Sequence, residues 1–410
     1  MRRRHLTASV LGLLALAFLT NASRGEKELF NEDLLKFFRF RALGPARQGS
    51  RILDIEVPPG RPYTFYVATA SGGLWKTENN GTTFRPIFDD QTAIAIGDVA
   101  VAPSNPDILW VGTGTPASGR ITLRGDGVYK STDGGRTWTY AGLKKTRHIG
   151  RIAIHPQNPD IVYVAALGYH FSFNRERGLF KTTDGGATWE KVLYISERVG
   201  VVDVALNPEN PDIVYAVTYD KWRLPWHFEE SGPESGIYKS TDAGKTWRRL
   251  ERGLPKGKFG RIGIAIYPKN PDILYAIVEN ANMRPPTEEE AKQDRAASRK
   301  PENRRIGGEV YRSDDGGESW TKRNAIEDNL GGGKWYGQIR VDPNDDQVVY
   351  VMSTRLQRSM DGGRTWGKKG IENLAAGVHV DHHVVWIDPE NSNHLILGND
   401  GGLYVSYDSG

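Results

Sequence analysis

Apolar and polar residues alternate in short runs along the chain from about residue 52 to its end, and turn signals separate the runs. Residues 151–155 (RIAIH) and 201–205 (VVDVA) are two such runs. A second type of run follows an Asn-Pro-Asp turn, as in NPDILWV from Asn105 and NPDIVYV from Asn158. Alternation with a period of two residues predicts β-strands, and helical periodicity is almost absent from the chain.

One turn sequence recurs between the strand-like runs. It reads GVYKSTDGGRTW at residues 127–138, and further copies occupy residues 178–189, 236–247, 310–320 and 356–366. A weaker copy at residues 73–84 has Asn79 and Phe84 in place of the carboxylate and the indole, and a seventh copy runs from residue 402 to Gly410. The repeating unit is therefore strand A, an Asn-Pro-Asp turn, strand B, a variable loop, strand C, an Asp-Gly-Gly turn and strand D.

Four short strands in each unit of about fifty residues predict an all-β fold, a β-propeller of four-stranded blades. About seven blades fit into residues 51–410, after an N-terminal extension at residues 23–50. The last unit lacks strand D. Either residues 37–41 (FFRFR) supply that strand and close the ring, or the sequence is a fragment that continues beyond Gly410 with further blades or domains.

The first 22 residues predict a secretory signal peptide. Arg2, Arg3 and Arg4 precede an apolar run at residues 6–19, and Ala22 offers a small residue at the cleavage site. An uncleaved anchor is the alternative, and no later run is long enough to span a membrane. Because the chain has no cysteine and therefore no disulfide, we expect export to a bacterial periplasm or exterior.

Charge and composition exclude several classes of function. The formal net charge is +4, and three of the positive charges lie in the predicted leader, so the chain has no clustered cationic face of the kind that binds nucleic acid. The absence of cysteine excludes a thiol nucleophile and cysteine-ligated metals. No phosphate-binding loop, nucleophile elbow or zinc-protease helix is present, and we predict no cofactor.

The repeated turn looks like a chemical site, but its repetition favours a structural role. Asp133 is expected to accept hydrogen bonds from its own turn, and the two glycines that follow it supply positive φ. Trp138 offers a broad face for packing between sheets. A catalytic group would occur once, so we predict structural roles for the whole set: Asp133, Asp184, Asp242, Asp315, Asp361 and Asp408, with Trp138, Trp189, Trp247, Trp320 and Trp366.

The pattern S-x-D-x-G-x-T-W at blade spacing resembles the Asp-box (bacterial neuraminidase) repeat of sialidases, xyloglucanase-type glycoside hydrolases and sortilin-type receptors. The dense KSTDGGxTW boxes with NPDxxYxA strands are most similar to bacterial proteins with a sortilin-like N-terminal propeller. The resemblance implies the fold over about residues 52–410. The lack of cysteine departs from the receptors, whose domains carry disulfides, and receptor biology is therefore not implied.

The glycosidase relatives differ from this chain at their catalytic positions. In xyloglucanase-like relatives an Asp stands two residues before the Gly-Gly that opens strand C, where this chain has Ala70 and Asn399. Sialidases require an arginine triad, a nucleophilic tyrosine and an Arg-Ile-Pro start. Arg39, Arg41 and Arg51 are available here, but no Arg-Ile-Pro occurs.

A ring of polar residues is predicted on the innermost strands. Five residues before the proline of the A–B turn the chain has Asp54, Asp98, Arg151, Asp203 and Gln338, and Arg261 and His382 lie two positions earlier in their own units. Two interpretations remain open: a polar ligand site in the channel, or mutual salt bridges with a structural role. Asp54, Asp98 and Asp203 are also the candidate catalytic carboxylates.

Loops between strands B and C form the opposite face, where function is expected. Aromatic candidates for ligand binding are Tyr169, Phe171, Trp222 and Trp226, although local burial is the alternative. The charged loop at about residues 280–307 contains a capping box from Thr287 and predicts a surface helix, a lid or a plain insertion.

His379, Asp381 and His383 alternate along one predicted strand. Three near neighbours on one strand rarely complete a tetrahedral metal site. We therefore expect a structural or channel-lining role for them and predict no metal.

The leading functional hypothesis is an exported binding module that recognises a peptide, protein or glycan through its loop face and channel. A glycoside hydrolase with paired carboxylates at the channel mouth is the alternative. A purely structural module of a longer surface protein is the third possibility.

Overall fold

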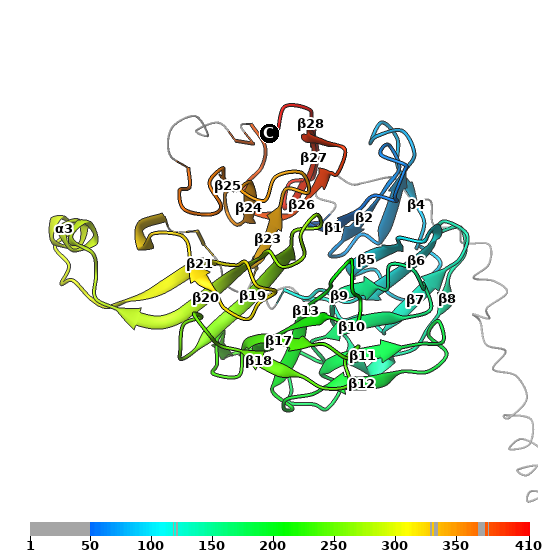
Figure 1. The fold of residues 1–410 in the computed structure, drawn as a ribbon, viewed down its shortest axis with the longest axis horizontal. Coiled ribbons are helices and arrows are strands. Elements are labelled where there is room, and N and C mark those ends of the chain that lie inside the picture. The colour runs from blue at the N-terminus through cyan, green and yellow to red at the C-terminus, as the bar shows by residue number, and fades with distance from the viewer. Residues whose placement is uncertain are drawn as a thin grey trace, which may run out of the picture. The chain divides into compact units, whose positions relative to one another are not determined.

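The computed structural model describes residues 50–410, except residues 118, 120–121, 329, 332–334, 368–373 and 376. These residues form seven antiparallel sheets arranged in a ring, a seven-bladed β-propeller (Figure 1), which confirms the predicted fold class. The predicted signal peptide and the predicted strand at residues 37–41 lie outside the described residues.

Five blades have the four predicted strands, and the chain order within each sheet is sequential. Blade 1 contains β1 (Ile52–Glu56), β2 (Phe65–Thr69), β3 (Leu74–Thr77) and β4 (Arg85–Pro86). Blade 2 contains β5 (Ile96–Ala102), β6 (Asn105–Thr113), β7 (Val128–Ser131) and β8 (Thr139–Tyr140). Blade 3 contains β9 (Ile149–Ile154), β10 (Val162–Ala166), β11 (Gly178–Thr182) and β12 (Glu190–Leu193). Blade 4 contains β13 (Val199–Leu206), β14 (Val214–Asp220), β17 (Gly236–Ser240) and β18 (Arg248–Leu250). Blade 5 contains β19 (Phe259–Ile266), β20 (Leu274–Arg284), β21 (Arg304–Ser313) and β22 (Thr321–Lys322).

The last two blades have three strands each within the described residues. Blade 6 contains β23 (Gln338–Val341), β24 (Val349–Met352) and β25 (Gln357–Ser359), and blade 7 contains β26 (His382–Asp388), β27 (Asn391–Asn399) and β28 (Leu403–Ser406). Short additions are the hairpin β15 (Trp222–Arg223) and β16 (Phe228–Glu229), the 3-10 turns η1 (Lys144–Thr146) and η2 (Ile326–Asp328), and helix α3 (Glu288–Ala296). None of the helices in the described part of the chain is long and apolar enough to cross a membrane.

Side-chain hydrogen bonds fix each repeated turn. In blade 2, Asp133 Oδ1 accepts from the Ser131 hydroxyl (2.8 Å) and the Thr137 N–H (2.9 Å), and Asp133 Oδ2 accepts from the Thr137 hydroxyl (2.7 Å). The Thr137 hydroxyl contributes most to lowering the pKa of Asp133, which falls to about 2. Gly134 and Gly135 follow with φ of 72° and 82°, where a side chain would be strained. The carboxylate therefore accepts the hydrogen bonds of the turn that joins strands C and D.

The repeated turn also contacts the A–B turn of its own blade. The Gly134 N–H donates to the Asp107 carbonyl (2.9 Å). Blades 3 to 6 repeat this bond with the pairs Gly185–Asp160, Ala243–Asp212, Gly316–Asp272 and Gly362–Gln347. Both kinds of turn therefore lie on one face of the ring, which we call the box face, and the long B–C loops lie on the other.

A second set of contacts, the interblade latch, joins the box turn of one blade to the preceding blade. Tyr66 of strand B and Lys76 of strand C both donate to the Gly134 carbonyl of the next blade, at 3.2 and 3.3 Å. Four more seams have the same cation-to-carbonyl bond: Lys130 to Gly185, Lys181 to Ala243, Lys239 to Gly316, and Arg358 to Ser409. The Tyr and Lys of the repeated sequence thus act between blades.

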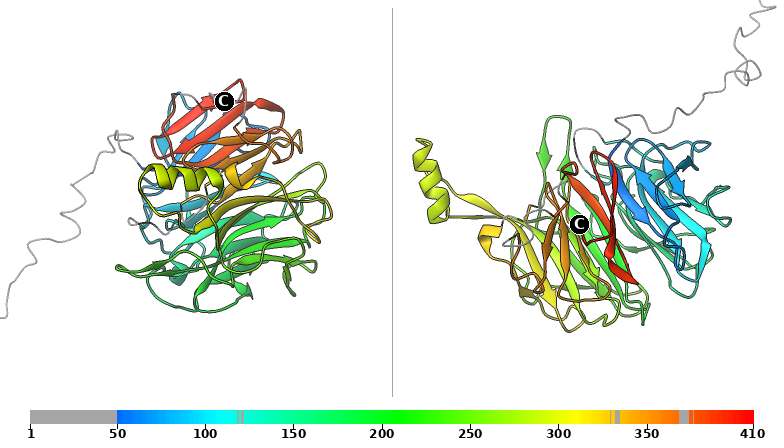
Figure 2. Two further views of the ribbon diagram at one scale, coloured as in Figure 1. Left: turned by 90° about the vertical axis from the view of Figure 1, so that its left-hand side faces the viewer. Right: turned by 90° about the horizontal axis from the view of Figure 1, so that it is seen from above.

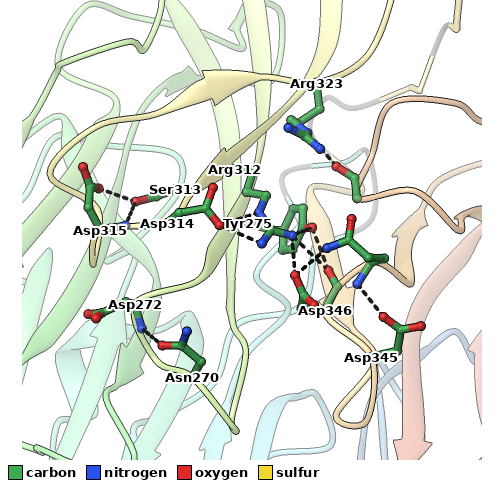
Figure 3. A network of polar contacts seen from close by, with 12 residues as sticks. Asn270, Asp272, Tyr275, Arg312, Ser313, Asp314, Asp315, Arg323, Asp345 and Asp346 are labelled. Atoms are coloured by element: carbon green, nitrogen blue, oxygen red, sulfur yellow. Dashed lines mark hydrogen bonds and ion pairs between the residues drawn. The ribbon is translucent and has the colours of Figure 1, made fainter.

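Between blades 5 and 6 an arginine replaces the lysine and makes a larger network (Figure 3). Arg312 forms ion pairs with Asp314 (2.7 Å) and Asp346 (2.6 Å) and donates to the Tyr275 hydroxyl (2.6 Å). That hydroxyl donates to the Asp346 carbonyl (2.7 Å). The box carbonyl of Gly362 accepts instead from Arg323 at 2.8 Å.

The seam between blades 7 and 1 is apolar where the others have the latch. Ile396 and Val405 occupy the positions of the latch tyrosine and lysine. Ile396 is fully buried in a cluster with Ile52, Phe65 and Val384. The first and last sheets lie side by side in the ring (Figures 1 and 2), and the described residues close it by hydrophobic packing together with a hydrogen bond from the Asn80 side chain to the Tyr407 hydroxyl.

The charged insertion of blade 5 forms an arm that projects from the sheet (Figure 2). Strands β20 and β21 extend into it, and α3 lies at its tip. The predicted capping box of Thr287 and Glu290 is confirmed. Arg284 pairs with Glu290 at 2.6 Å, and Arg304 pairs with Asp294 at 2.7 Å, so ion pairs hold the helix to its strands.

Candidate functional site

The predicted polar ring converges on one arginine in the channel. Arg151 Nη1 lies 3.0 Å from Asp98 Oδ1 and 3.5 Å from Asp54 Oδ1, and its Nε lies 3.4 Å from Asp203 Oδ1. Arg151 also donates to the Gln338 side-chain carbonyl at 3.4 Å. The structure thus brings together the five residues that share a position before the A–B proline.

The same carboxylates also bind the backbone of the following blade. Asp98 Oδ2 accepts from the Ile152 N–H at 2.7 Å, and Asp54 Oδ2 accepts from the Val99 N–H at 3.2 Å. Asp203 Oδ2 accepts from the N–H of residue 264 at 3.4 Å. One oxygen of each carboxylate therefore faces Arg151, while the other ties neighbouring inner strands together.

Burial dominates the electrostatics of this ring. It raises the pKa of Asp98, although Arg151 opposes the shift. Burial alone would lower the pKa of Arg151, but the carboxylates of Asp98, Asp54 and Asp203 outweigh it and raise that pKa. The guanidinium is therefore fixed in its charged form.

Two further members of the ring were not predicted from the sequence. Burial, followed by the charge of Asp54, raises the pKa of Glu56 to about 8, so this carboxyl holds its proton at neutral pH. Arg340 donates to the Gln338 side chain at 2.9 Å. Each lies two residues beyond a predicted ring residue, on the same strand face, and that spacing is the signal by which the sequence could have identified them.

The ring borders a cavity of about 340 Å³. Arg151, Asp203 and Arg340 line it together with Pro208 and Pro268 of the A–B turns. The cavity therefore lies toward the box face, away from the long B–C loops.

Arg261 and His382 do not join the ion pairs of Arg151, although the charges of Asp203 and Arg151 act on Arg261. Arg261 is buried, and its side chain lies against the backbone of Gly337, where a Cβ would meet it at 2.9 Å. Burial lowers the pKa of His382 to about 4. Strand β26 begins at His382, so His379 and Asp381 precede the strand rather than alternating along it.

The polar cluster around β26 consists of side-chain pairs. The Tyr336 hydroxyl donates to Asp381, and His383 Nε2 lies 2.7 Å from Asp400 Oδ1. Within the part of the chain that the structure describes, no three His, Asp or Glu side chains are arranged to hold a metal ion.

The predicted aromatic loops of blades 3 and 4 meet on the loop face. The rings of Phe173 and Trp222 lie 5.7 Å apart. Arg223 packs over Phe171 at 5.6 Å and over Phe228 at 5.2 Å. These loops line a hollow of about 600 Å³.

Trp226 borders the hollow at the tip of the β15–β16 hairpin and is 81% exposed. Tyr169 belongs to the same loop as Phe171 and contacts its ring at 5.8 Å. All four aromatic candidates from the sequence therefore contribute to one surface.

Buried polar residues hold the two aromatic loops from beneath, and the sequence did not single them out. Arg177 donates to the Tyr169 and Ser172 carbonyls, both at 2.9 Å. Lys221 Nζ lies 2.8 Å from His170 Nδ1. Because each partner directly adjoins an aromatic residue, this contact joins the two loops.

Seven sheets in a ring, braced by the repeated Ser/Thr-x-Asp turn, fit the class of Asp-box β-propellers. Residues 126–298 match the family model described as "Sortilin, neurotensin receptor 3", and residues 311–322 match the BNR/Asp-box repeat.

Curated relatives are xyloglucanases. The chain is 25% identical over 334 residues to a xyloglucanase of Paenibacillus sp., a match that covers 73% of this chain and 29% of the relative. It is 22% identical over 385 residues to a probable oligoxyloglucan-reducing end-specific xyloglucanase of Neosartorya fischeri, covering 83% and 41%. The chain therefore spans well under half the length of these relatives.

Solved structures share the fold. The GH74 xyloglucanase from Xanthomonas campestris aligns with a TM-score of 0.62 at 19% identity, over 89% of this chain and 53% of the other. YCF48 from Cyanidioschyzon merolae aligns with a TM-score of 0.53 at 15% identity, over 89% and 97%. A structure of YCF48 bound to D1 peptide aligns with a TM-score of 0.52 at 14% identity, over 88% and 94%.

Proposed function

We propose that this chain is an exported propeller that binds a peptide or glycan on the aromatic loops of blades 3 and 4. The observation that carries the proposal is the hollow of about 600 Å³ beside Trp226, whose indole is 81% exposed. An exposed indole beside a hollow lined by further aromatic rings is typical of ligand recognition.

The surface is preformed in the structure. Arg177 holds the loop of blade 3 through two carbonyls, and the His170–Lys221 contact joins it to the loop of blade 4. A binding surface that is already ordered spends less free energy on ordering when the ligand arrives. The ordered aromatic rings therefore favour a ligand-binding role for these loops over simple burial of the loops against the blades.

Both ligand chemistries have support. Flat aromatic faces stack on sugar rings, and the xyloglucanase relatives act on a glycan by name. The same rings accept peptide side chains, and a structural neighbour is described with a bound peptide.

The test is a binding measurement with xyloglucan oligosaccharides and a peptide library, using isothermal titration calorimetry for the hits. Trp226→Ala should weaken binding at least tenfold without lowering the melting temperature. Tyr63→Ala is the matched control, because Tyr63 is an exposed aromatic residue of the blade 1 A–B turn. Unchanged affinity in both Trp226→Ala and Trp222→Ala would refute the proposed surface.

A glycoside hydrolase is the second candidate, and one observation favours it. Glu56 keeps its proton at neutral pH, and the carboxylate of Asp54 lies two residues away on the same strand face. A protonated acid beside a carboxylate is the pair that glycoside hydrolysis needs. Against it, Asp54, Asp98 and Asp203 are all engaged with Arg151. Turnover of a glycan panel that is lost in Glu56→Gln would support this candidate, and no turnover by the wild type would exclude it.

A further inference from the structure

The box turn of blade 1 contains the single Asn-Gly pair of the sequence, Asn80–Gly81. Asn80 has φ of 55° and Gly81 has φ of 83°, so both adopt the left-handed backbone conformation. Asparagine tolerates this conformation better than most residues, and Asn80 therefore keeps the turn while adding a carboxamide to it. Four other boxes have glycine at the position of Asn80: Gly134, Gly185, Gly316 and Gly362.

An Asn-Gly pair is chemically reactive. Because glycine has no side chain to shield its backbone nitrogen, and because its backbone turns freely, that nitrogen can attack the side-chain carbonyl carbon of the asparagine. A bond forms between Gly81 N and Asn80 Cγ, the bond from Cγ to Nδ2 breaks, and the Gly81 amide proton leaves with Nδ2 as ammonia. Water then opens the five-membered ring. Opening at Cγ leaves aspartate, and opening at the main-chain carbonyl leaves isoaspartate.

Hydrogen bonds of the closed turn hold the attacking nitrogen. The Gly81 N–H donates to the hydroxyl of Thr77 at 2.9 Å, and Thr77 is only 1% exposed. That hydroxyl also accepts from the Asn79 N–H at 3.3 Å and donates to the Asn79 side-chain carbonyl at 3.0 Å. The Gly81 nitrogen must therefore leave a buried acceptor before it can turn toward Asn80 Cγ.

Two further contacts hold Asn80 itself. Its N–H donates to the Tyr63 carbonyl at 2.8 Å, and its side-chain Nδ2 donates to the Tyr407 hydroxyl. Among the described residues, no donor reaches the buried Oδ1 atom of Asn80. The carboxamide is therefore held at its nitrogen, by a residue of the neighbouring blade.

The contact with Tyr407 places the pair at the seam between blades 7 and 1. The Tyr407 ring stacks on His394, with ring centroids 4.8 Å apart. Ile396 and Val405 occupy the latch positions of this seam, and the hydrogen bond from Asn80 to Tyr407 crosses it. Separation of the two blades therefore removes the partner of the carboxamide.

We propose that Asn80–Gly81 is a modification site that the closed ring protects and an open seam exposes. While the box turn of blade 1 is closed, Asn80 remains an amide. When blades 7 and 1 separate and the turn loosens, the Gly81 nitrogen and water convert Asn80 to aspartate or isoaspartate with loss of ammonia. The proposal is independent of the ligand of the loop face.

The isoaspartate product should prevent the turn from closing as before. Isoaspartate routes the main chain through Cγ and so adds a methylene to it, in a turn where the Gly81 nitrogen must reach Thr77. The aspartate product keeps the main chain, and its carboxylate can accept from the Tyr407 hydroxyl. Conversion to isoaspartate therefore leaves a lasting record that the seam has opened.

Peptide mapping by mass spectrometry measures the conversion. The full chain is incubated in one mildly alkaline buffer, with and without denaturing urea, and we expect Asn80 to convert at least tenfold faster in urea. Asn158 is the internal control, because the proline that follows it has no N–H and cannot react in this way. Conversion of Asn80 at equal rates in the folded and the unfolded chain would refute the protection.

Variants test whether the hydrogen bonds of the turn provide this protection. Thr77→Val removes the acceptor of the Gly81 N–H, and Thr77→Ser is the matched control that keeps a hydroxyl. In the folded chain, Thr77→Val should convert Asn80 at least threefold faster than Thr77→Ser. Tyr407→Phe removes the partner of the carboxamide and serves alone if Thr77→Val does not fold. If neither variant converts faster than Thr77→Ser, the closed turn does not protect Asn80.

The effect on the ring is measured on the separated products. Ion exchange isolates the converted chain, which has one negative charge more than the original. After removal of urea, the isoaspartate chain should melt at a lower temperature than unconverted chain taken through the same urea cycle, and Asn80→Asp shows the effect of the charge alone. Equal melting temperatures for the isoaspartate and unconverted chains would show that conversion leaves the seam unchanged and would overturn this part of the proposal.

Discussion

The interblade latch makes a prediction that can be tested at a single lysine. Lys239 is 9% exposed, and its ammonium donates to the Gly316 carbonyl at 2.8 Å and to Glu318 at 2.9 Å. Methionine has a similar length and can keep the packing on the Tyr215 ring. Lys239→Met therefore removes the charge and its two bonds while leaving most of the apolar contact.

The expected loss of stability depends on which hydrogen bonds the two partners of Lys239 keep in the variant. The Gly316 carbonyl still accepts from the Tyr215 hydroxyl at 2.8 Å, so it is not left unsatisfied. Glu318 is half-exposed and still pairs with Arg248. A hydrogen bond to a charged group contributes about 1.5 to 3 kcal/mol, and the partly exposed ion pair adds less than about 1 kcal/mol. We expect a net loss of about 2 kcal/mol, because desolvation of the ammonium offsets part of this gain.

Urea denaturation followed by tryptophan fluorescence measures this loss, with the melting temperature as a second readout. Lys245→Met is the matched control, since Lys245 is exposed in the next box turn of the same blade. If Lys239→Met and Lys245→Met have the same free energy of unfolding within about 0.5 kcal/mol, a level typical of neutral surface changes, the latch does not stabilise the seam.

Three further predictions concern single positions. Ala243 has φ of 58° where four other boxes have glycine, so Ala243→Gly should stabilise the fold by about 1 kcal/mol in urea denaturation, whereas Ala187→Gly should not. The folded pKa of Glu56, about 8, lies above its ordinary value of 4.5, so stability should fall as pH rises between these values; a Glu56→Gln variant that keeps the same slope in a pH series would contradict this. Asp133 has a folded pKa of about 2, below its ordinary 3.8, so its contribution is present above pH 4 and is lost toward pH 2. Asp133→Ala should lower the melting temperature and leave ligand affinity per folded molecule unchanged, and a folded variant that no longer binds would overturn that role.

The fold could be predicted because its signals are local. Alternation over a few residues and the turn chemistry of Asp133 and its glycines repeat in each unit, and neither depends on distant partners. The latch could not be predicted in this way, because Lys239 acts on Gly316, and nothing in the sequence around either residue identifies the other. A lysine on an outer strand is expected to face solvent.

The candidate site also has one part that could be predicted from the sequence and one part that could not. Counting back from each A–B proline brought Asp54, Asp98 and Arg151 together, because equivalent positions of a propeller face one axis. The Lys221–His170 contact escaped prediction, since a buried lysine is exceptional. Only the packing of the two loops reveals that both side chains are enclosed.

The interblade latch has a direction, since each blade holds the box of its successor, and the seam between blades 7 and 1 has Ile396 and Val405 at the latch positions instead. Under mechanical tension the ring therefore has a preferred point of rupture. Six seams resist separation with charged hydrogen bonds, which lose most of their strength within an ångström or two. The seventh has hydrophobic contact at those positions, which weakens on cooling, and a neutral hydrogen bond from the Asn80 side chain to the Tyr407 hydroxyl in place of the charged ones. In single-molecule stretching, the propeller should open first at this seam, and the force required should decrease as temperature is lowered toward 0 °C.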